Sequence, residues 1–283
     1  MSAWRLSIIT TVTMLAFAGN SLLCRAALAH TRIDPASFTS VRLLSGAVTL
    51  FAIVWIRHRG PALMGNWISA GSLFTYAACF SFAYTSLPAG IGALLLFGAV
   101  QATMISYGLA AGERLSIAKS FGMLLALAGL VGLLLPGVEA PPITGAAMML
   151  IAGIAWGIYS LRGRGAGDPL GETAGNFVRT VPMTLLVSLI LFSKATPDTA
   201  GLLYAVASGT LASGMGYAIW YAALPALRAT TAAMVQLSVP AIAALAGALM
   251  LGESITLRLV LASIAILGGI AIFITNRAPA LSR

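Results

Sequence analysis

Four uncharged polar side chains lie deep inside apolar stretches of the sequence: Asn20, Gln101, Gln236 and Ser238. An amide is costly in apolar surroundings unless it finds a hydrogen-bond partner, so these side chains should face the interior of the protein. There, an amide oxygen can accept from an ammonium group and an amide nitrogen can donate to a carboxylate, so the two could hold an amino acid. The alternative is that these groups bond across neighbouring helices and only fix the packing.

Aromatic residues form the second set of candidate binding groups. Tyr76, Phe80 and Tyr84 recur at every fourth position, which places them on one face of a helix. Such a face could stack against a flat or apolar ligand, or it could pack against neighbouring helices. The aromatic part of the predicted site is completed by Phe97, Trp156, Tyr159 and Tyr217.

Three positions are candidates for moving parts. Tyr84 and Tyr221 occupy equivalent places in two similar halves of the chain. They are either anchors in the interfacial aromatic belts or parts of gates at opposite ends of the protein. Pro240 lies inside an apolar run, where it removes a backbone hydrogen bond and should kink the helix. That kink would serve either as a hinge or as a fixed packing feature.

Charged side chains are almost absent from the apolar stretches. Arg42 and Arg179 are the exceptions, and their equivalent positions in the two halves favour a shared structural role over the capture of a carboxylate. Each should reach toward the membrane surface or bind a carbonyl or carboxylate oxygen. All seven acidic residues fall in or beside connections. The apolar stretches therefore offer no acid that could bind and release a proton at their centre.

The other reactive residue types are few and dispersed. His30 and His58 lie in connections and the acids do not cluster, so the sequence indicates neither a metal site nor the catalytic pair of an enzyme. Cys24 and Cys79 are predicted to be two buried thiols. No cofactor is expected.

Composition identifies the elements that must position these groups. Hydrophobic residues make up 59% of the 283 residues and charged residues only 8%, with a mean hydropathy of +0.98. Apolar runs of about 20 residues in so charge-poor a chain are typical of a polytopic membrane protein built from helices. The ten predicted spans are 6–24, 36–56, 66–87, 90–110, 117–136, 142–161, 173–193, 199–222, 229–251 and 256–276.

The two halves of the chain share a set of motifs. The first half contains Tyr84-x-x-Leu87-Pro88 and Gly112-Glu113, and the second contains Tyr221-x-x-Leu224-Pro225 and Gly252-Glu253. We therefore expect one membrane domain over 1–283, made of repeat one at about 1–137 and repeat two at about 138–283. Five spans per repeat is an odd number, so the second repeat enters the membrane upside down. The predicted fold is all-α, with ten transmembrane helices as two inverted five-helix repeats.

Basic residues orient this bundle. With the N-terminus in the cytoplasm, the cytoplasmic segments carry Arg5, Arg57, Arg59, Arg114, Lys119, Arg162, Arg164, Arg228, Arg277 and Arg283. The outer segments carry only Arg25, Arg32, Lys194 and Arg258, as the positive-inside rule requires. Both termini are thus predicted to be cytoplasmic. The net charge of +9 then reflects contact with anionic membrane lipid and not a nucleic-acid partner.

This pattern resembles the EamA-type permeases of the drug/metabolite transporter superfamily. The resemblance covers nearly the whole chain and is carried by the starts of the two halves (Phe17–Ser21 and Trp156–Ser160), the arginine in the second span of each half, and the Gly-Glu that closes the fourth. It implies an exporter of the bacterial inner membrane, often for amino acids or related metabolites. It also implies a central cavity surrounded by spans one, three, four, six, eight and nine, with spans five and ten behind it.

Together, residues and resemblance predict export of small neutral or aromatic amino acids and related metabolites by alternating access. Because no acid reaches a span centre, the prediction is a uniporter, and one chain should suffice. The alternative is a proton-coupled exporter of small molecules or multiple drugs, in which Glu113 or Glu253 would carry the proton.

Overall fold

The computed structural model describes residues 2–60, 64–112, 116–137, 139–163, 167–227, 232 and 235–275, and every regular element within them is a helix. The helices of the first half are α1 (Ala3–His30), α2 (Pro35–His58), α3 (Trp67–Tyr84), α4 (Ala89–Ala110) and α5 (Ile117–Leu134). The second half contains α6 (Ile143–Arg162), α7 (Pro169–Ile190), α8 (Thr199–Ala207), η2 (Ser208–Met215), α9 (Gly216–Ala223), α11 (Ser238–Leu251) and α12 (Leu257–Thr275). Two short 3-10 turns, η1 (Phe192–Lys194) and η3 (Leu224–Ala226), follow α7 and α9.

Eight helical segments of the described chain are long and apolar enough to cross a membrane. One of them is a continuous path through α8, the π-helix η2, α9 and η3. The 18-residue α3 and the 14-residue α11 are not among the eight. The chain is therefore a multi-pass helical membrane protein, while the full number of ten spans stays a prediction.

Two Asp-Pro pairs mark the starts of helices. Pro35 and Pro169 are the first residues of α2 and α7, where the missing backbone N–H has no partner to lose. Asp34 caps α2, since its side chain accepts from the backbone N–H groups of Ala36 and Ser37. The predicted start of span seven at 173 is thus four residues late, because Pro169 begins the helix.

The Gly-Glu motif is a helix ending. Gly252 follows α11 with φ +67°, a left-handed conformation that glycine adopts without strain, and Gly112 follows α4 with φ +91°. The sharp turn at Gly252 sends Glu253 back along α11, where its N–H donates to the carbonyl of Gly247. Glu113, the equivalent acid of the first half, lies outside the described residues.

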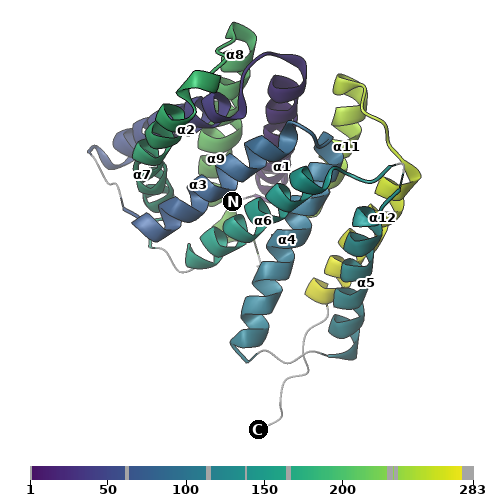
Figure 1. Cartoon of the computed structure of the whole chain (residues 1–283). Coiled ribbons are helices and arrows are strands. Elements are labelled where there is room, and N and C mark those ends of the chain that lie inside the picture. Colours follow the sequence, from purple (N-terminus) through teal and green to yellow (C-terminus); the bar gives the residue numbers. More distant parts are fainter. Residues whose placement is uncertain are drawn as a thin grey trace.

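The helices form two outer groups around a central one (Figure 1). α5 and α12 lie side by side at one edge of the bundle, and α2 packs against α7 and the α8–η2 segment at the other. α1, α3, α4, α6, α9 and α11 lie between these groups. Gly122 and Gly269 let α5 and α12 approach closely, since a Cβ on Gly122 would lie 2.5 Å from the carbonyl oxygen of Gly269.

Candidate functional site

A cavity of about 530 Å³ lies among the central helices. It is lined by residues of α1, α3, α4, α6, α7, η2 and α9, and no described residue of α5 or α12 reaches it. The predicted site residues that line it are Asn20, Tyr76, Phe80, Phe97, Gln101, Trp156, Tyr159, Tyr217 and Gln236, and the predicted gate residue Tyr221 lines it as well. Residues far apart in sequence thus converge on one space.

Trp156 forms the aromatic centre of this cavity. Its ring stacks on Tyr217 at 5.4 Å between centroids and 17° between planes, and on Tyr159 at 5.3 Å and 28°. The Tyr76 ring lies 4.8 Å away in a tilted arrangement. Four rings from α3, α6 and α9 therefore form one continuous surface, on which a flat ligand group can stack.

A second aromatic group extends this surface. Phe80 lies 5.4 Å from Tyr76, and Phe17 of α1 lies 5.8 Å from Tyr217 and 6.0 Å from Trp220. Phe17 and Trp220 also line the cavity. The sequence prediction left both out of the site, although Phe17 lies three residues before Asn20 and therefore on nearly the same face of α1.

Helix α7 contributes polar groups that the sequence did not indicate. The Tyr159 hydroxyl donates to Thr173 Oγ1 at 3.2 Å, and the Thr173 hydroxyl donates to the Tyr221 hydroxyl oxygen at 3.2 Å. Asn176 and Glu172 line the same region. The predicted span began at 173, which left Glu172 in a connection and Thr173 at the helix end. The signal that could have placed them was Pro169, which starts the helix one turn earlier.

The amides of Gln101 and Gln236 lie at the cavity wall without a protein partner among the described residues. An amide with free donor and acceptor groups beside a cavity can bind a ligand, whereas one that fixes packing is already bonded to a neighbouring helix. Asn20 differs, because both its amide nitrogen and its amide oxygen are hydrogen-bonded to other side chains. It donates to the Tyr76 hydroxyl oxygen at 3.1 Å and accepts from the Ser208 hydroxyl at 2.7 Å.

The two membrane arginines have different surroundings. Arg179 lies in the middle of α7 and donates to the backbone carbonyls of Met64 (2.7 Å) and Gly175 (2.9 Å), one of the kinds of partner that the sequence predicts for it. Arg42 is only 1% exposed and donates to the Tyr76 hydroxyl oxygen at 3.1 Å. It neither reaches the surface nor binds a carbonyl or carboxylate among the described residues, so the contact expected of each arginine is found for Arg179 and not for Arg42.

Three predicted residues are absent from the cavity lining. Tyr84 is fully buried, so it is no interfacial belt residue, and its hydroxyl donates to the Ala89 carbonyl at 3.3 Å. The Ser238 hydroxyl bonds to the Val235 carbonyl at 2.7 Å. Pro240 lies in the first turn of α11, after an interruption at Leu237, and not in the interior of a continuous helix.

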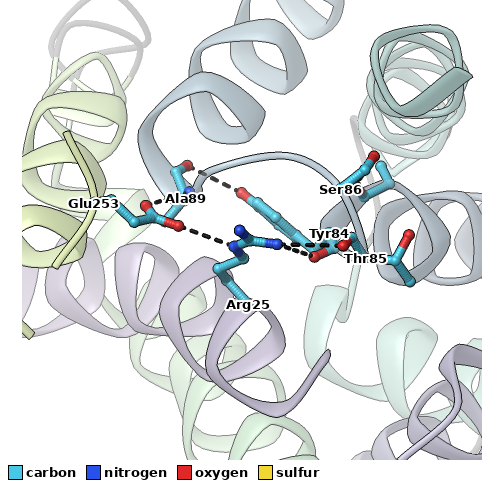
Figure 2. Close-up of polar contacts among 7 residues, drawn as sticks. Arg25, Tyr84, Thr85, Ser86, Ala89 and Glu253 are labelled. Atoms are coloured by element: carbon cyan, nitrogen blue, oxygen red, sulfur yellow. Dashed lines mark hydrogen bonds and ion pairs between the residues drawn. The ribbon is translucent and has the colours of Figure 1, made fainter. Parts of the chain in front are cut away.

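An ion pair lies beyond one end of the cavity lining (Figure 2), because Arg25 follows the lining residue Ser21, and Tyr84 follows the lining residue Phe80, each by one helical turn. Glu253 accepts from Arg25 Nε at 2.9 Å and from the backbone N–H of Ala89 at 2.7 Å. Arg25 Nη1 in turn donates to the carbonyl of Tyr84 at 3.0 Å. These contacts tie α1, the end of α3, the start of α4 and the turn after α11 to one another. We call these four residues, Arg25, Tyr84, Ala89 and Glu253, the closed end.

The opposite end of the cavity reaches the helix termini. Gly163 after α6, Pro169 at the start of α7 and Leu227 after η3 all belong to its lining. Gly163 is exposed, whereas Tyr84 and Ala89 at the closed end are fully buried. The cavity is therefore asymmetric along the axis of the bundle.

Comparison with known proteins agrees with this architecture. A solved structure described only as "Crystal structure of protein" superposes with a TM-score of 0.68, at 20% identity, over 95% of this chain and 97% of that one. At that identity the likeness concerns the fold alone.

Sequence relatives give the family. The "Uncharacterized protein PA1977" of Pseudomonas aeruginosa is 55% identical over 275 residues, which is 96% of each chain. The "Uncharacterized transporter YoaV" of Bacillus subtilis is 25% identical over 255 residues, covering 84% of this chain and 86% of its own. The sequence model of the EamA-like transporter family matches residues 143–275. The chain is therefore a member of the EamA-like transporter family, within the drug/metabolite transporter superfamily.

Proposed function

We propose that this transporter exports small neutral amino acids, aromatic ones among them, across the bacterial inner membrane. It works by alternating access as a uniporter, so the solute moves down its own gradient, and one chain forms the complete path. The observation that carries this proposal is the make-up of the cavity, in which stacked aromatic rings lie beside free amide groups.

The chemistry of the lining suits a zwitterion with an apolar side chain. Trp156 and its three ring partners offer a stacking surface, while Gln101 and Gln236 offer both donors and acceptors. Glu172, near the end opposite the closed end, is the one charged side chain among the described lining residues. The cavity of about 530 Å³ falls within the usual range for small-molecule sites, about 300–1,000 Å³.

Helix packing supports two inverted repeats. In the two repeats, α3 is equivalent to the α8–η2–α9 segment, and α6 is equivalent to α1. The contact between α3 and α6 therefore corresponds to that between the α8–η2–α9 segment and α1, and both contacts are present. The same equivalence turns α4 with α6 into α11 with α1, while α2–α7 and α5–α12 each map onto themselves. A site between two such halves can be exposed to either side in turn.

The basic residues give the sidedness. With both termini in the cytoplasm, the closed end faces outward and the end near Gly163 and Pro169 faces the cytoplasm. The structure then represents an inward-facing state, in which an exported solute enters from the cell interior.

A proton-coupled mechanism is the second candidate, and Glu172 is the observation that favours it. It is an acid on the cavity wall, beside the Tyr159–Thr173–Tyr221 hydrogen bonds, where protonation could be linked to solute binding. Glu253 is less suited to that role, because Arg25 and the Ala89 N–H already bind its carboxylate.

Uptake by purified protein in proteoliposomes tests the proposal. We expect labelled phenylalanine, tyrosine and small neutral amino acids to equilibrate across the membrane, with no effect of a pH gradient. Gln101→Ala and Gln236→Ala should each raise KM about fivefold, the effect of losing about one hydrogen bond. Thr210→Val is the matched control, since its hydroxyl bonds only to Val206 of its own helix and is absent from the cavity lining.

Three results would argue against this assignment. Accumulation driven by a pH gradient and abolished by Glu172→Gln would replace uniport with proton coupling. Transport of a cationic dye without amino-acid flux would assign the protein to drug efflux. Equal KM values for the glutamine variants and the Thr210→Val control would show that the two amides do not bind the solute.

A further inference from the structure

Arg42 is a cation without a counter-ion. It lies on α2 with its guanidinium carbon 5.3 Å from the centre of the Tyr76 ring and 4.9 Å from that of Phe80. Its Nε and Nη1 groups are buried without hydrogen-bond partners, and among the described residues it forms no ion pair. Ring faces stabilise a cation but leave its net charge in place. The positive charge of Arg42 therefore acts on any group bound beside Tyr76.

The hydrogen bonds around Tyr76 all run toward its oxygen. Arg42 Nη2 donates to that oxygen at 3.1 Å, and Asn20 Nδ2 donates to it at 3.1 Å. Asn20 is held in this orientation by Ser208, whose hydroxyl donates to Asn20 Oδ1 at 2.7 Å. A phenol oxygen has two lone pairs and one proton, so both acceptor positions of Tyr76 are used and its own proton remains available.

Tyr76 faces the cavity at the end of this chain of donors. It belongs to the lining, together with Asn20 and Phe80, and no described residue accepts its proton. The positive charge of Arg42 behind the ring makes the Tyr76 hydroxyl a stronger donor. Hydrogen bonds joined in a chain polarise one another in surroundings of low dielectric constant. A donor backed by a cation selects for an anionic acceptor.

We propose that Tyr76, polarised by Arg42 and oriented by Asn20, is the binding point for the carboxylate group of the transported solute. This inference rests on the proposed function and names the group of the amino acid that the site requires. Arg42 acts through Tyr76 and is a positioning residue. The amino group and side chain of the solute then extend toward the amides and the Trp156 stack.

The comparison with Arg179 separates this role from a structural one. Arg179 is the equivalent arginine of the second half, and its contacts are two backbone carbonyls, which a purely structural arginine would be expected to make. Arg42 instead donates to a single side chain that borders the cavity, and two of its nitrogen atoms remain unpartnered. A cation that served packing alone would be expected to have found a carbonyl or an acid.

Matched pairs of probes test the inference without depending on transport. The first pair is L-phenylalanine and L-phenylalaninamide, and the second is 3-phenylpropanoate and 3-phenylpropanamide, so each pair differs only by the carboxylate. Their affinities are measured by the concentration dependence of thermal stabilisation of the purified protein. Wild-type protein should bind each carboxylate at least about tenfold more tightly than its amide, as expected for one hydrogen bond to a charged group.

Four variants identify the groups responsible. Arg42→Gln and Tyr76→Phe should weaken binding of the carboxylates about tenfold and leave the amides unchanged, while Arg42→Lys should restore part of the loss. Asn20→Asp places a fixed carboxylate beside Tyr76 and should lower affinity for the carboxylate probes for the same reason. Arg179→Gln should leave the preference intact.

The outcomes separate this inference from the proposed function. Equal affinities of wild-type protein for a carboxylate and its amide overturn the inference, even if amino acids are transported. The inference is also overturned if Tyr76→Phe and Asn20→Asp fold, as shown by a monodisperse elution profile, and keep the wild-type preference. An Arg42-dependent preference without amino-acid flux in proteoliposomes supports the carboxylate site and overturns the proposed function.

Discussion

At the scale of single residues, Trp156 has the most contacts with other rings of the cavity. It stacks on Tyr159 and Tyr217 and lies 4.8 Å from Tyr76. We expect Trp156→Ala to raise KM for aromatic amino acids about tenfold, because aromatic pairing contributes about 0.5–1.5 kcal/mol beyond the burial that is also lost. Trp156→Phe should recover most of this loss, as measured by initial rates of counterflow.

Trp55 provides the control for that substitution. It lies on α2, is 48% exposed and pairs only with Phe51. Trp55→Ala removes a tryptophan from the surface of the bundle and should leave KM unchanged. Equal KM values for wild-type protein and Trp156→Ala would show that the aromatic stack does not bind the solute.

Thr173 joins two tyrosines across the cavity wall. Its hydroxyl accepts from Tyr159 and donates to Tyr221, so Thr173→Val removes both hydrogen bonds with little change in volume. We expect a loss of about 1–3 kcal/mol, from two bonds of about 0.5–1.5 kcal/mol each. Thr173→Ser keeps the hydroxyl and should stay close to wild type. Thermal unfolding measures the difference, and equal transition temperatures for the valine and serine variants would contradict it.

The candidate site could be predicted from residue types only in part. Amides and aromatic residues inside apolar spans are conspicuous, and most of those predicted do line the cavity. Tyr84 looked like a continuation of the Tyr76–Phe80 face, yet it lies beyond the end of the cavity and is buried at the closed end. Helical spacing gives a face but not the depth at which a cavity stops, because depth depends on the neighbouring helices.

At the scale of elements, Asp34 shows how a connection is fixed. One of its oxygens caps α2, and the other accepts from the backbone N–H of Thr196 at 2.9 Å, which ties the start of α2 to the segment before α8. Burial alone would raise the pKa of Asp34, but the hydrogen bonds from Ser37, Thr196 and Ala36 outweigh it and lower the pKa below its ordinary value. The carboxylate therefore stabilises the folded protein.

The sign of that shift gives a pH dependence. Because the pKa of Asp34 is lower in the folded protein, its contribution is complete above the unfolded value of about 3.9 and is lost as pH falls through the lower folded value. Asp34→Ala should lower stability at neutral pH by about 1 kcal/mol, as for loss of a helix cap. The difference in transition temperature between wild type and variant should shrink below about pH 4. A difference independent of pH would contradict this role.

Element positions were predicted better than element ends. Apolar run lengths predicted span two from 36, one residue after the observed start of α2 at Pro35, but predicted span seven from 173, four residues after α7 begins at Pro169. The π-helix from Ser208 to Met215 was not predicted. A Cβ on Gly209 would collide with the Arg42 carbonyl, so this glycine permits the close approach of α2 to the π-helical segment.

At the scale of the whole molecule, we expect the Arg25–Glu253 pair (Figure 2) to hold the closed end shut. The proposed alternating access would require these contacts to separate, and the ion pair is largely buried, so removal of one charge leaves the other without compensation. Glu253→Gln keeps the size of the side chain and an acceptor for Ala89 but removes the attraction to Arg25. We expect this variant to spend more time open at that end.

Cys24 is a native reporter for this opening. It is fully buried next to Arg25, and Cys79 can be replaced by serine to leave a single thiol. A membrane-impermeant maleimide should label Cys24 slowly in wild-type protein and about tenfold faster in Glu253→Gln, since a shift of about 1.4 kcal/mol between two states changes their ratio tenfold. The reagent should act from the outer side, where the predicted orientation puts the closed end.

Two controls separate gating from loss of structure. Asp198→Asn removes an acid that caps α8 without forming an ion pair in the described structure, so it should leave labelling unchanged. Arg25→Glu combined with Glu253→Arg restores the attraction with the charges exchanged and should return labelling toward the wild-type rate. If the exchanged pair labels as fast as Glu253→Gln, the effect comes from disturbed packing around Tyr84 and not from the ion pair. Slow labelling in all variants would mean that this end opens by a route in which α1 and Glu253 stay together.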